Sequence, residues 1–381
     1  MTASFTAVTS FTGAAEPYRG GDPYADYRSA AVPFEDLPDL ADRRLGGAVV
    51  AANDEFFAER ENLLVPGPAR FDPGLFGHKG KVMDGWETRR RRGASAGAPH
   101  PADGDRDWAL IRLGVPGVVR GVVVDTAHFR GNHPRAVSVE GASVPGAPSP
   151  AELLDAAWTT LVPPIPVGGH AANVFAVHCE RPLTHLRLGQ HPDGGVARLR
   201  VHGEAVPDPS WIRALGVLDV AALENGGLVE DASDRFYSSP LRTILPGRPA
   251  RMDEGWETRR RRDDGHDWVR YRLAGRAVLR ALELDTGCLK GNSAGWAEIW
   301  ARDGEKGEWG QILPRTRLQP DAVHRFVVGG GGAASAAATA AAATHVRLEV
   351  YPDGGIGRLR VYGELTEGAV RGLEERWGVV G

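Results

Sequence analysis

The string Gly-Trp-Glu-Thr-Arg-Arg-Arg-Arg occurs at Gly85–Arg92 and again at Gly255–Arg262. Because so crowded a polar string is not expected twice by chance, the chain contains an internal duplication. Other pairs recur in the same order and at one common spacing: Asp125-Thr126 with Asp285-Thr286, Gly131-Asn132 with Gly291-Asn292, and Pro192–Gly195 with Pro352–Gly355. Two long copies, each large enough to bury its own core, indicate two domains and not a solenoid of short repeats.

The composition of the 381 residues fits this division. A content of 42% hydrophobic and 25% charged residues is typical of globular domains. The 50 glycines and 27 prolines indicate many turns, and short runs such as Trp108–Leu113 and Gly121–Asp125 have the pattern of β-strands. Since strands do not alternate with helices, we predict an all-β protein in which each copy forms an antiparallel jelly-roll β-sandwich.

Hydrophobic periodicity and turn residues also predict how the chain is divided. The expected order is a partly disordered lead over 1–43, a first domain over 44–206, a connecting helix over 207–223, a second domain over 224–366 and a closing helix over 367–381. The turn Asp193–Gly195 lies between two strand-like runs, Thr184–Leu188 and Val196–Val201. This arrangement predicts that the two runs pair as a hairpin.

Net charge and cysteine content limit the classes of binding partner and the cellular compartment that fit this sequence. The net charge of −4 and the pI near 6.3 argue against nucleic acid or an anionic membrane as a partner, despite the arginine runs. The sequence shows no secretory signal pattern and no apolar run of membrane-spanning length. Cys179 and Cys288 do not occupy equivalent repeat positions, so we expect no disulfide framework and a reducing cytoplasm.

The repeated string offers cations beside a carboxylate. In an extended segment one face carries Glu87, Arg89 and Arg91, and the other carries Trp86, Thr88, Arg90 and Arg92. The guanidinium groups are expected to lower the pKa of the Glu87 carboxyl and to keep it ionised. Arginine forks bind carboxylate and ureido oxygens, which predicts a small-anion site. The alternative is a solvated charged strand whose tryptophan packs in the core.

A second cluster follows a strand-like run and holds Asp125, His128, Asn132 and His133. His128 is the candidate for proton transfer, because an imidazole titrates near neutral pH. Metal ligation by Asp125, His128 and His133 is another use of the cluster, but no compact zinc-site spacing is present. We therefore predict no cofactor, while a divalent metal stays open. The sequence also has no serine-hydrolase elbow, Walker loop or dinucleotide fingerprint.

Several strings of the first copy carry a family resemblance. They are Leu45–Gly47, Asn53–Ala58, Glu61–Leu64, Met83–Arg92, Asp107-Trp108, Asp125–Pro134, Thr184–Leu188 and Pro192–Gly195. These strings resemble the allantoicase family, whose members hydrolyse allantoate to (S)-ureidoglycolate and urea in allantoin and purine breakdown. The resemblance covers roughly residues 43–365 and implies tandem jelly-roll domains of the galactose-binding-like type, assembled as a homo-oligomer. The second copy departs from the family pattern at Cys288-Leu289, where the first copy has His128-Phe129.

Allantoate carries a carboxylate and two ureido arms on one carbon, so its site needs both cations and acceptors for N–H groups. We predict the catalytic residues Glu87, Asp125 and His128, and the substrate-binding residues Trp86, Thr88, Arg89, Arg90 and Asn132, with Glu257, Arg259, Arg260, Asp285 and Asn292 as their second-copy equivalents. In this hypothesis Arg89 or Arg90 orients the carboxylate and Glu87 accepts ureido N–H groups or acts as a base. Asp125 and His128 then move a proton to the departing urea.

Two other classes of protein fit parts of the sequence. Galactose-binding-like sandwiches include non-catalytic modules that hold carbohydrates or other ligands on their loops. A glycan binder is expected to show exposed aromatic rings, whereas the repeated strings favour arginine and glutamate. An RNA-binding protein would use the arginine runs and lose affinity steeply with salt, but the acidic overall balance disfavours it.

Overall fold

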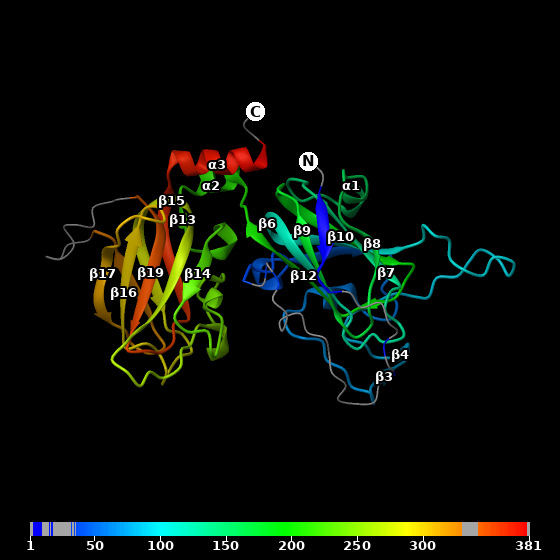
Figure 1. The fold of residues 1–381 in the computed structure, drawn as a ribbon, viewed down its shortest axis with the longest axis horizontal. Helices are drawn as coiled ribbons and strands as arrows, with labels where there is room; N and C mark the ends of the chain where they lie inside the picture. The colour runs from blue at the N-terminus through cyan, green and yellow to red at the C-terminus, as the bar shows by residue number, and fades with distance from the viewer. Residues whose placement is uncertain are drawn as a thin grey trace. The chain divides into compact units, whose positions relative to one another are not determined.

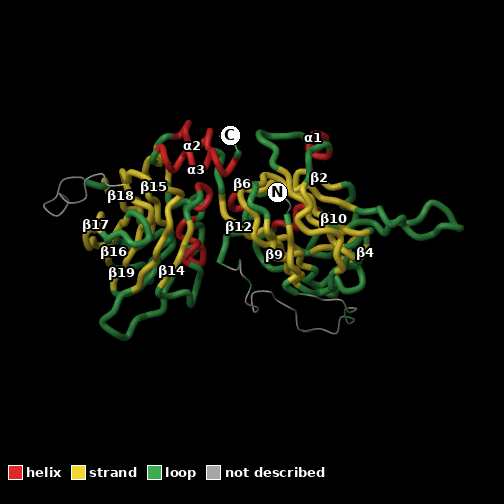
Figure 2. The backbone as a smooth tube through the Cα atoms, turned by 45° about the horizontal axis from the view of Figure 1, so that its top comes forward, coloured by secondary structure: helices red, strands yellow, loops and turns green. Residues whose placement is uncertain are grey.

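The computed structural model describes residues 3–9, 15, 17, 32, 34, 36–329 and 342–378. The chain divides into two compact units, Met1–Glu204 and Ala205–Gly381, and each is built mainly of β-strands (Figures 1 and 2). The expected disorder of the N-terminal lead falls mostly on residues outside the described part. No helix among the described residues is long and apolar enough to cross a membrane.

The first unit consists of strands around one long central strand, with a few short helices. Its strands are β1 (Ser4–Ala7), β2 (Ala48–Ala52), β3 (Phe76–Gly77), β4 (Gly80–Lys81), β5 (Trp86–Glu87), β6 (Asp107–Asp125), β7 (Ala136–Ala142), β8 (Thr159–Pro166), β9 (Ala172–His178), β10 (Leu183–His191), β11 (Gly195–Val196) and β12 (Arg198–Ala205). Its helices are η2 (Arg43–Leu45), η3 (Arg60–Leu64) and α1 (Pro150–Leu154).

The second unit repeats this plan. Its strands are β13 (Val217–Asp219), β14 (Leu228–Ala232), β15 (Asp267–Asp285), β16 (Trp296–Arg302), β17 (Gly310–Arg317), β18 (Val323–Val327), β19 (Ala342–Tyr351) and β20 (Arg358–Leu365). Its helices are α2 (Pro209–Leu215), η4 (Leu223–Asn225), η5 (Pro240–Ile244), η6 (Met252–Glu254) and α3 (Glu367–Trp377).

One strand in each unit takes part in both layers of the sandwich. The first part of β6 pairs with β2 and β10, and its last residues, from Gly121, pair with β9. In the second unit, β15 pairs first with β14 and β19 and then with β18 and β20. The sequence predicted Trp108–Leu113 and Gly121–Asp125 as separate strands, but both belong to β6. The antiparallel jelly-roll sandwich predicted for each copy is confirmed.

Buried and solvent-facing residues alternate along the start of the long strand β15, as expected for a strand of a two-layer sandwich. At the start of β15, Val269, Tyr271 and Leu273 are buried, whereas Arg270 and Arg272 reach solvent at least partly. Successive side chains of a strand point to opposite faces, so the apolar set faces the core. The buried ring of Tyr271 has its hydroxyl 2.8 Å from the Thr243 hydroxyl. Burial therefore leaves no open polar group at this ring.

The hairpin predicted at Asp193–Gly195 is wrong. Strand β10 lies between β6 and β7, while β12 pairs with β6, so the two runs do not pair with each other. The turn instead holds the repeated arginine string. The Thr88 N–H donates to the Gly194 carbonyl at 3.0 Å, and the Arg91 N–H donates to the Asp193 carboxylate at 2.7 Å. The following residues Gly195 and Val196 pair with β5, so the backbone groups at this turn are satisfied by the string and not by a β10–β12 hairpin.

Glycine is required where this turn crosses the core. A Cβ at Gly195 would lie 2.0 Å from the ring of Phe129, which is fully buried beneath the turn. In the second unit a Cβ at Gly355 would lie 2.8 Å from Leu289. Leu289 therefore fills the place of Phe129, and the change from His-Phe to Cys-Leu keeps this part of the core apolar.

The short connecting and C-terminal helices are confirmed as α2 and α3. Asp208 caps α2, Pro209 opens it, and the helix stops at Gly216, which has a positive φ of 68°. The helix is shorter than the predicted range of 207–223 because the following residues form β13, which pairs with β20. Residues Ser4–Ala7, within the predicted lead, form β1 and pair antiparallel with β9.

The tryptophans of the repeated strings anchor each core. Trp86 and Trp256 are 0% exposed, and their indole N–H groups donate to the carbonyls of Asp54 and Asp234 at 2.8 and 2.9 Å. We expect Trp86→Ala to lower the free energy of unfolding by about 3 to 5 kcal/mol, because it leaves a cavity and an unpaired carbonyl. Denaturant titration measures this loss. Trp211→Ala is the control, since Trp211 is 60% exposed, and a loss of equal size there would contradict the prediction.

Candidate active site

The arginines of the first string have different partners. The Arg89 Nε donates to the Asp54 carboxylate at 2.6 Å, and Arg91 forms an ion pair with the buried Asp107 at 2.6 Å. Arg90 is exposed and makes no hydrogen bond or ion pair with any residue that the structure describes. Of the two arginines proposed for the substrate carboxylate, Arg90 is therefore the one whose guanidinium is open.

Glu87 lies on β5, where it pairs with Gly195 and bridges Ala58. Its Oε1 accepts a hydrogen bond from the Asn132 side chain at 2.9 Å. Burial raises the pKa of the Glu87 carboxyl, while the Asn132 hydrogen bond and the nearby Arg90 charge act in the opposite direction. The sequence predicted the reverse shift. That prediction was wrong because burial outweighs the nearby positive charge, and because Arg89 and Arg91 pair with Asp54 and Asp107 and not with Glu87.

Trp86 and Thr88 lie beneath this site. Trp86 is fully buried, and Thr88 is 3% exposed with its hydroxyl accepting a hydrogen bond from the Gly194 N–H at 3.2 Å. Neither side chain is open to a substrate, in contrast to the predicted binding role. Their hydrogen bonds, from the Trp86 indole to Asp54 and from Gly194 to Thr88, fix the backbone on either side of Glu87.

The loop after β6 carries Asp125, His128 and Asn132. The Asp125 carboxylate accepts the Ala127 N–H at 2.7 Å, and the Asn132 carbonyl accepts the Gly195 N–H at 2.8 Å. His128 has a positive φ of 67°, and its backbone N–H donates to the His170 ring at 2.9 Å. This strained backbone conformation is maintained by contacts from a distant segment.

The His128 ring stacks on Phe71, with ring centroids 5.3 Å apart. Burial lowers the pKa of His128, although the nearby carboxylates of Asp125 and Asp84 act in the opposite direction. Its Nδ1 is buried with no hydrogen-bond partner among the described residues. The ring is therefore held in its neutral form at pH 7.

The predicted catalytic residues fall into two groups. Glu87 lies with Asn132 and Arg90, whereas His128 lies with Asp125 and His170. Asn132 joins the loop to the string through its hydrogen bond with Glu87, and the Phe129 ring lies against Gly85.

The histidines do not form a metal-binding arrangement. His133, the other proposed metal ligand, has its Nδ1 2.7 Å from the Arg130 carbonyl. Within the described part of the chain, no group of three or more His, Cys, Asp or Glu side chains could hold a metal ion.

The second string repeats the scaffold but not the Glu–Asn pair. Arg259 pairs with Asp234 at 2.8 Å, while Arg260 is exposed. The Glu257 N–H donates to Ser238 at 2.9 Å, and the Asn292 amide lies 3.1 Å from the Met252 sulfur. A cavity of about 230 Å³ is lined by Ser233, Asp234, Arg259, Arg260, Arg261, Arg262, Asp263 and Asp267.

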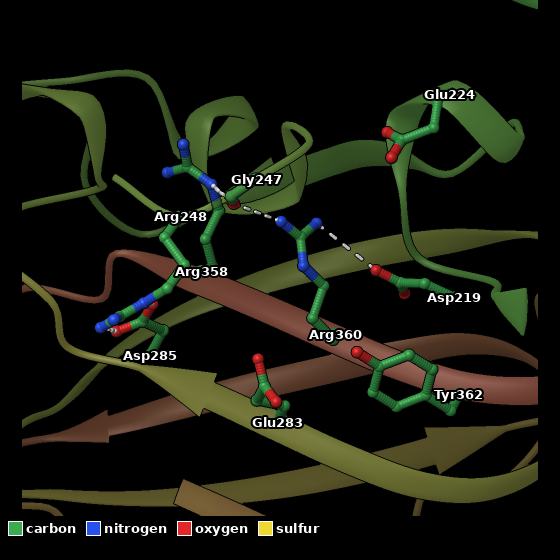
Figure 3. A pocket seen from close by; sticks show the side chains of 9 residues that line it. All are labelled: Asp219, Glu224, Gly247, Arg248, Glu283, Asp285, Arg358, Arg360 and Tyr362. Carbon is green, nitrogen blue, oxygen red and sulfur yellow. Dashed lines mark hydrogen bonds and ion pairs between the residues drawn. The ribbon is translucent and has the colours of Figure 1, made fainter. Parts of the chain in front are cut away.

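Asp285 lies apart from this string, in another cavity of the second unit. Its carboxylate is 1% exposed and forms an ion pair with Arg248 at 2.8 Å (Figure 3). Arg358 and Arg360 line the same cavity. Sequence reasoning missed these arginines, although the alternating Arg198-Leu199-Arg200 recurs as Arg358-Leu359-Arg360 and was a usable signal.

Comparison with known proteins covers both units. A family described as "Allantoicase repeat" matches residues 38–206 and 218–366. A Streptomyces coelicolor protein named "Probable allantoicase" is 66% identical over 369 residues, with 96% of each chain covered. A protein of the same name from Streptomyces avermitilis is 64% identical over 384 residues, with 100% of each chain covered. The crystal structure of allantoicase from Saccharomyces cerevisiae matches with a TM-score of 0.70 at 29% identity, covering 86% of this chain and 93% of that one.

The environment of His128 predicts a measurable titration. We expect its ring to titrate below the ordinary histidine pKa of about 6.5, because burial disfavours the cation. The native state then takes up this proton at lower pH than the unfolded chain, so the stabilising contribution is present above about 6.5 and is lost as pH falls. NMR titration of the imidazoles measures the midpoint. Phe71→Ala should move it upward by admitting water, and a wild-type midpoint above 6.5 would contradict the assignment.

Proposed function

The chain belongs to the allantoicase family, and we propose that it hydrolyses allantoate to (S)-ureidoglycolate and urea. The relatives named as allantoicases match this chain over nearly its whole length, and both repeats are matched. The reaction is that of a hydrolase acting on carbon–nitrogen bonds in linear amidines. The alternative function, a non-catalytic carbohydrate-binding module, is disfavoured because these relatives match the whole chain and are named as enzymes.

One observation carries the assignment of the site. In the first unit a carboxyl group of raised pKa, Glu87, is hydrogen-bonded to Asn132 and lies near the open cation Arg90. Arg90 is suited to the substrate carboxylate because its guanidinium has no competing partner among the described residues. Glu87 is suited to ureido N–H groups or to proton transfer, since acid–base groups work best with a pKa moved toward neutral pH.

The hydrolysis replaces a carbon–nitrogen bond of the central carbon by a carbon–oxygen bond. We propose that Glu87 takes a proton from the attacking water, whose oxygen ends on the central carbon. The same proton passes to the nitrogen of the departing ureido arm, which leaves as urea. Asn132 fixes the Glu87 carboxylate, and Arg90 orients the substrate.

In this proposal Asp125 and His128 are positioning residues. The Asp125 carboxylate caps the loop that carries Asn132, and a neutral His128 packs between Phe71 and His170. In the second unit, Arg260 and Glu257 are proposed to contact the ureide at a weaker site, since Asn292 pairs with Met252 and not with the glutamate.

Other expectations remain proposals. We propose domain boundaries at 44–206 and 224–366, a homo-oligomeric assembly, and a cytoplasmic location without a nucleic-acid partner. The net charge of −4 and the two free cysteines support the compartment and the absence of a nucleic-acid partner.

Substituting the proposed base tests the reaction. We expect Glu87→Gln to lower kcat for urea release from allantoate by about 10² to 10⁴-fold, the usual contribution of a positioned acid–base group. Gln keeps the size of the side chain and the contact with Asn132, so the unfolding midpoint should change little. Urea is measured in a coupled assay. Full activity in folded Glu87→Gln protein would refute the role of Glu87, and wild-type protein that releases no urea would refute the function.

Arg90 and Arg92 form a matched pair of exposed arginines in one string. We expect Arg90→Ala to raise KM at least tenfold, because a charge-assisted hydrogen bond to the substrate carboxylate is lost. Arg92→Ala should leave KM within about twofold, since surface substitutions away from a site have small effects. Equal effects of the two substitutions would show that Arg90 has no special contact with substrate.

A further inference from the structure

The cavity around Asp285 in the second unit has the features of a ligand site, and we name it the acidic pocket. It is lined by Asp219, Glu224, Gly247, Arg248, Glu283, Asp285, Arg358, Arg360 and Tyr362 (Figure 3). Its volume of about 310 Å³ is at the lower end of the range for small-molecule pockets. All of these residues belong to the second unit, so the pocket is complete within it.

The two inner arginines of the acidic pocket are largely occupied by the protein itself. Arg358 donates to the carbonyls of Gly247 and Glu254 at 3.0 and 2.8 Å. Arg360 donates to the carbonyls of Leu245 and Gly247, each at 2.7 Å, and pairs with Asp219 at 3.4 Å. These cations fix the wall of the pocket and offer little to an anion.

The open groups are mainly acceptors. The Glu224 Oε2 is buried and has no hydrogen-bond partner among the described residues. Burial raises the pKa of Glu224, and burial raises that of the neighbouring Asp219 to about 6. Asp219 pairs with Arg360 and accepts backbone N–H groups from Ala221 and Val361. Glu224 is therefore the carboxyl group that lacks the solvation or pairing that an ionised group normally has. An N–H-rich ligand group would supply the missing donors.

Tyr362 provides the complementary donor. Its hydroxyl makes no hydrogen bond with a described residue, and it points into the acidic pocket from β20 near Glu283 (Figure 3). Burial raises the pKa of Tyr362, and the charges of Glu283 and Asp219 act in the same direction. The phenol therefore stays protonated and can donate to a ligand carbonyl. At the rim, Arg248 has a side chain 63% exposed; its Nε and Nη2 pair with Asp285, and its Nη1 has no partner among the described residues.

The first unit fills the corresponding place. There Arg44 stands where the second unit has Glu224, and it pairs with Asp42 at 2.6 Å. Val123 replaces Glu283, and the buried Phe34 ring packs over Val123. The same ring contacts His202, which replaces Tyr362, at a centroid distance of 5.5 Å. The acidic pocket is thus a specific change of the second copy and not a gap common to the fold.

We propose that the acidic pocket binds one ureido arm of a small ureido acid, with Glu224 accepting its N–H groups, Tyr362 donating to its carbonyl and Arg248 pairing with its carboxylate. The choice of a ureido acid rests on the proposed function, whereas the need for N–H donors rests on the open acceptors alone. This site is separate from the Glu87 site of the first unit. It gives the second unit a binding role that its diverged loop at Cys288 does not provide.

Binding is tested with hydantoate, which carries one ureido arm and a carboxylate but no second arm to release. Full-length protein with Glu87→Gln, Arg90→Ala and Arg260→Ala is used, so that neither the first-unit site nor the weaker site at Glu257 and Arg260 contributes. Calorimetry should show one hydantoate bound per chain, with acetate at least tenfold weaker. Glu224→Arg introduces the residue of the first unit and should abolish binding. Tyr362→Phe removes only the hydroxyl and should weaken binding at least fivefold without changing the unfolding midpoint.

Glu364→Gln is the matched control. Glu364 lies on β20, the strand that carries Tyr362, and its side chain is 55% exposed. This substitution should leave hydantoate affinity unchanged. Unchanged affinity in both Glu224→Arg and Tyr362→Phe, or no binding in the parent protein, overturns the pocket even where wild-type protein releases urea from allantoate. Wild-type protein that releases no urea overturns the proposed function, while hydantoate binding that depends on Glu224 would still support the pocket.

Discussion

Each arginine string can lie against its sandwich only because carboxylates from distant segments neutralise it. Asp54 forms an ion pair with Arg89, and Asp234 forms the equivalent pair with Arg259. The carboxylates of Asp193 and Asp353 accept the backbone N–H groups of Arg91 and Arg261. Unpaired guanidinium groups crowded at one edge would repel one another. Pairing of Arg89 and Arg91 leaves Arg90 as the open arginine beside Glu87, while Arg92 is exposed further along the string. The pairing that lets the string fold therefore also selects the cation that a ligand at Glu87 can reach.

The sequence predicted the parts that depend on repetition and alternation. The duplicated string located both units, and period-two runs such as Trp108–Leu113 identified the strands. It could not predict that the Asp193–Gly195 turn binds Thr88 and Arg91 instead of closing a hairpin, because that choice depends on partners about one hundred residues away. The pKa of Glu87 was likewise mispredicted, since a list of neighbouring cations carries no information on burial.

The two copies share the contacts that hold the scaffold but differ in the side-chain contacts at their surfaces. The tryptophan, the first arginine and the Gly-Gly turn have the same contacts in both units. The loop with the positive-φ residue keeps its backbone contact, with His170 accepting from His128 and Asp321 accepting from Cys288. Glu257 and Asn292 keep the residue types of Glu87 and Asn132, but Asn292 contacts Met252 and not the glutamate. The acidic pocket comes from exchanged residues, such as Glu224 in place of Arg44.

The long strand shared by both layers couples the unfolding of one layer to the unfolding of the other. Because β6 and β15 are hydrogen-bonded in one layer along one half and in the other layer along the other half, neither sheet can separate without removing a central strand from its partner. Each sandwich therefore melts as one cooperative block and not layer by layer. Partial opening, and with it proteolysis or hydrogen exchange at low free energy, is confined to loops and edge strands.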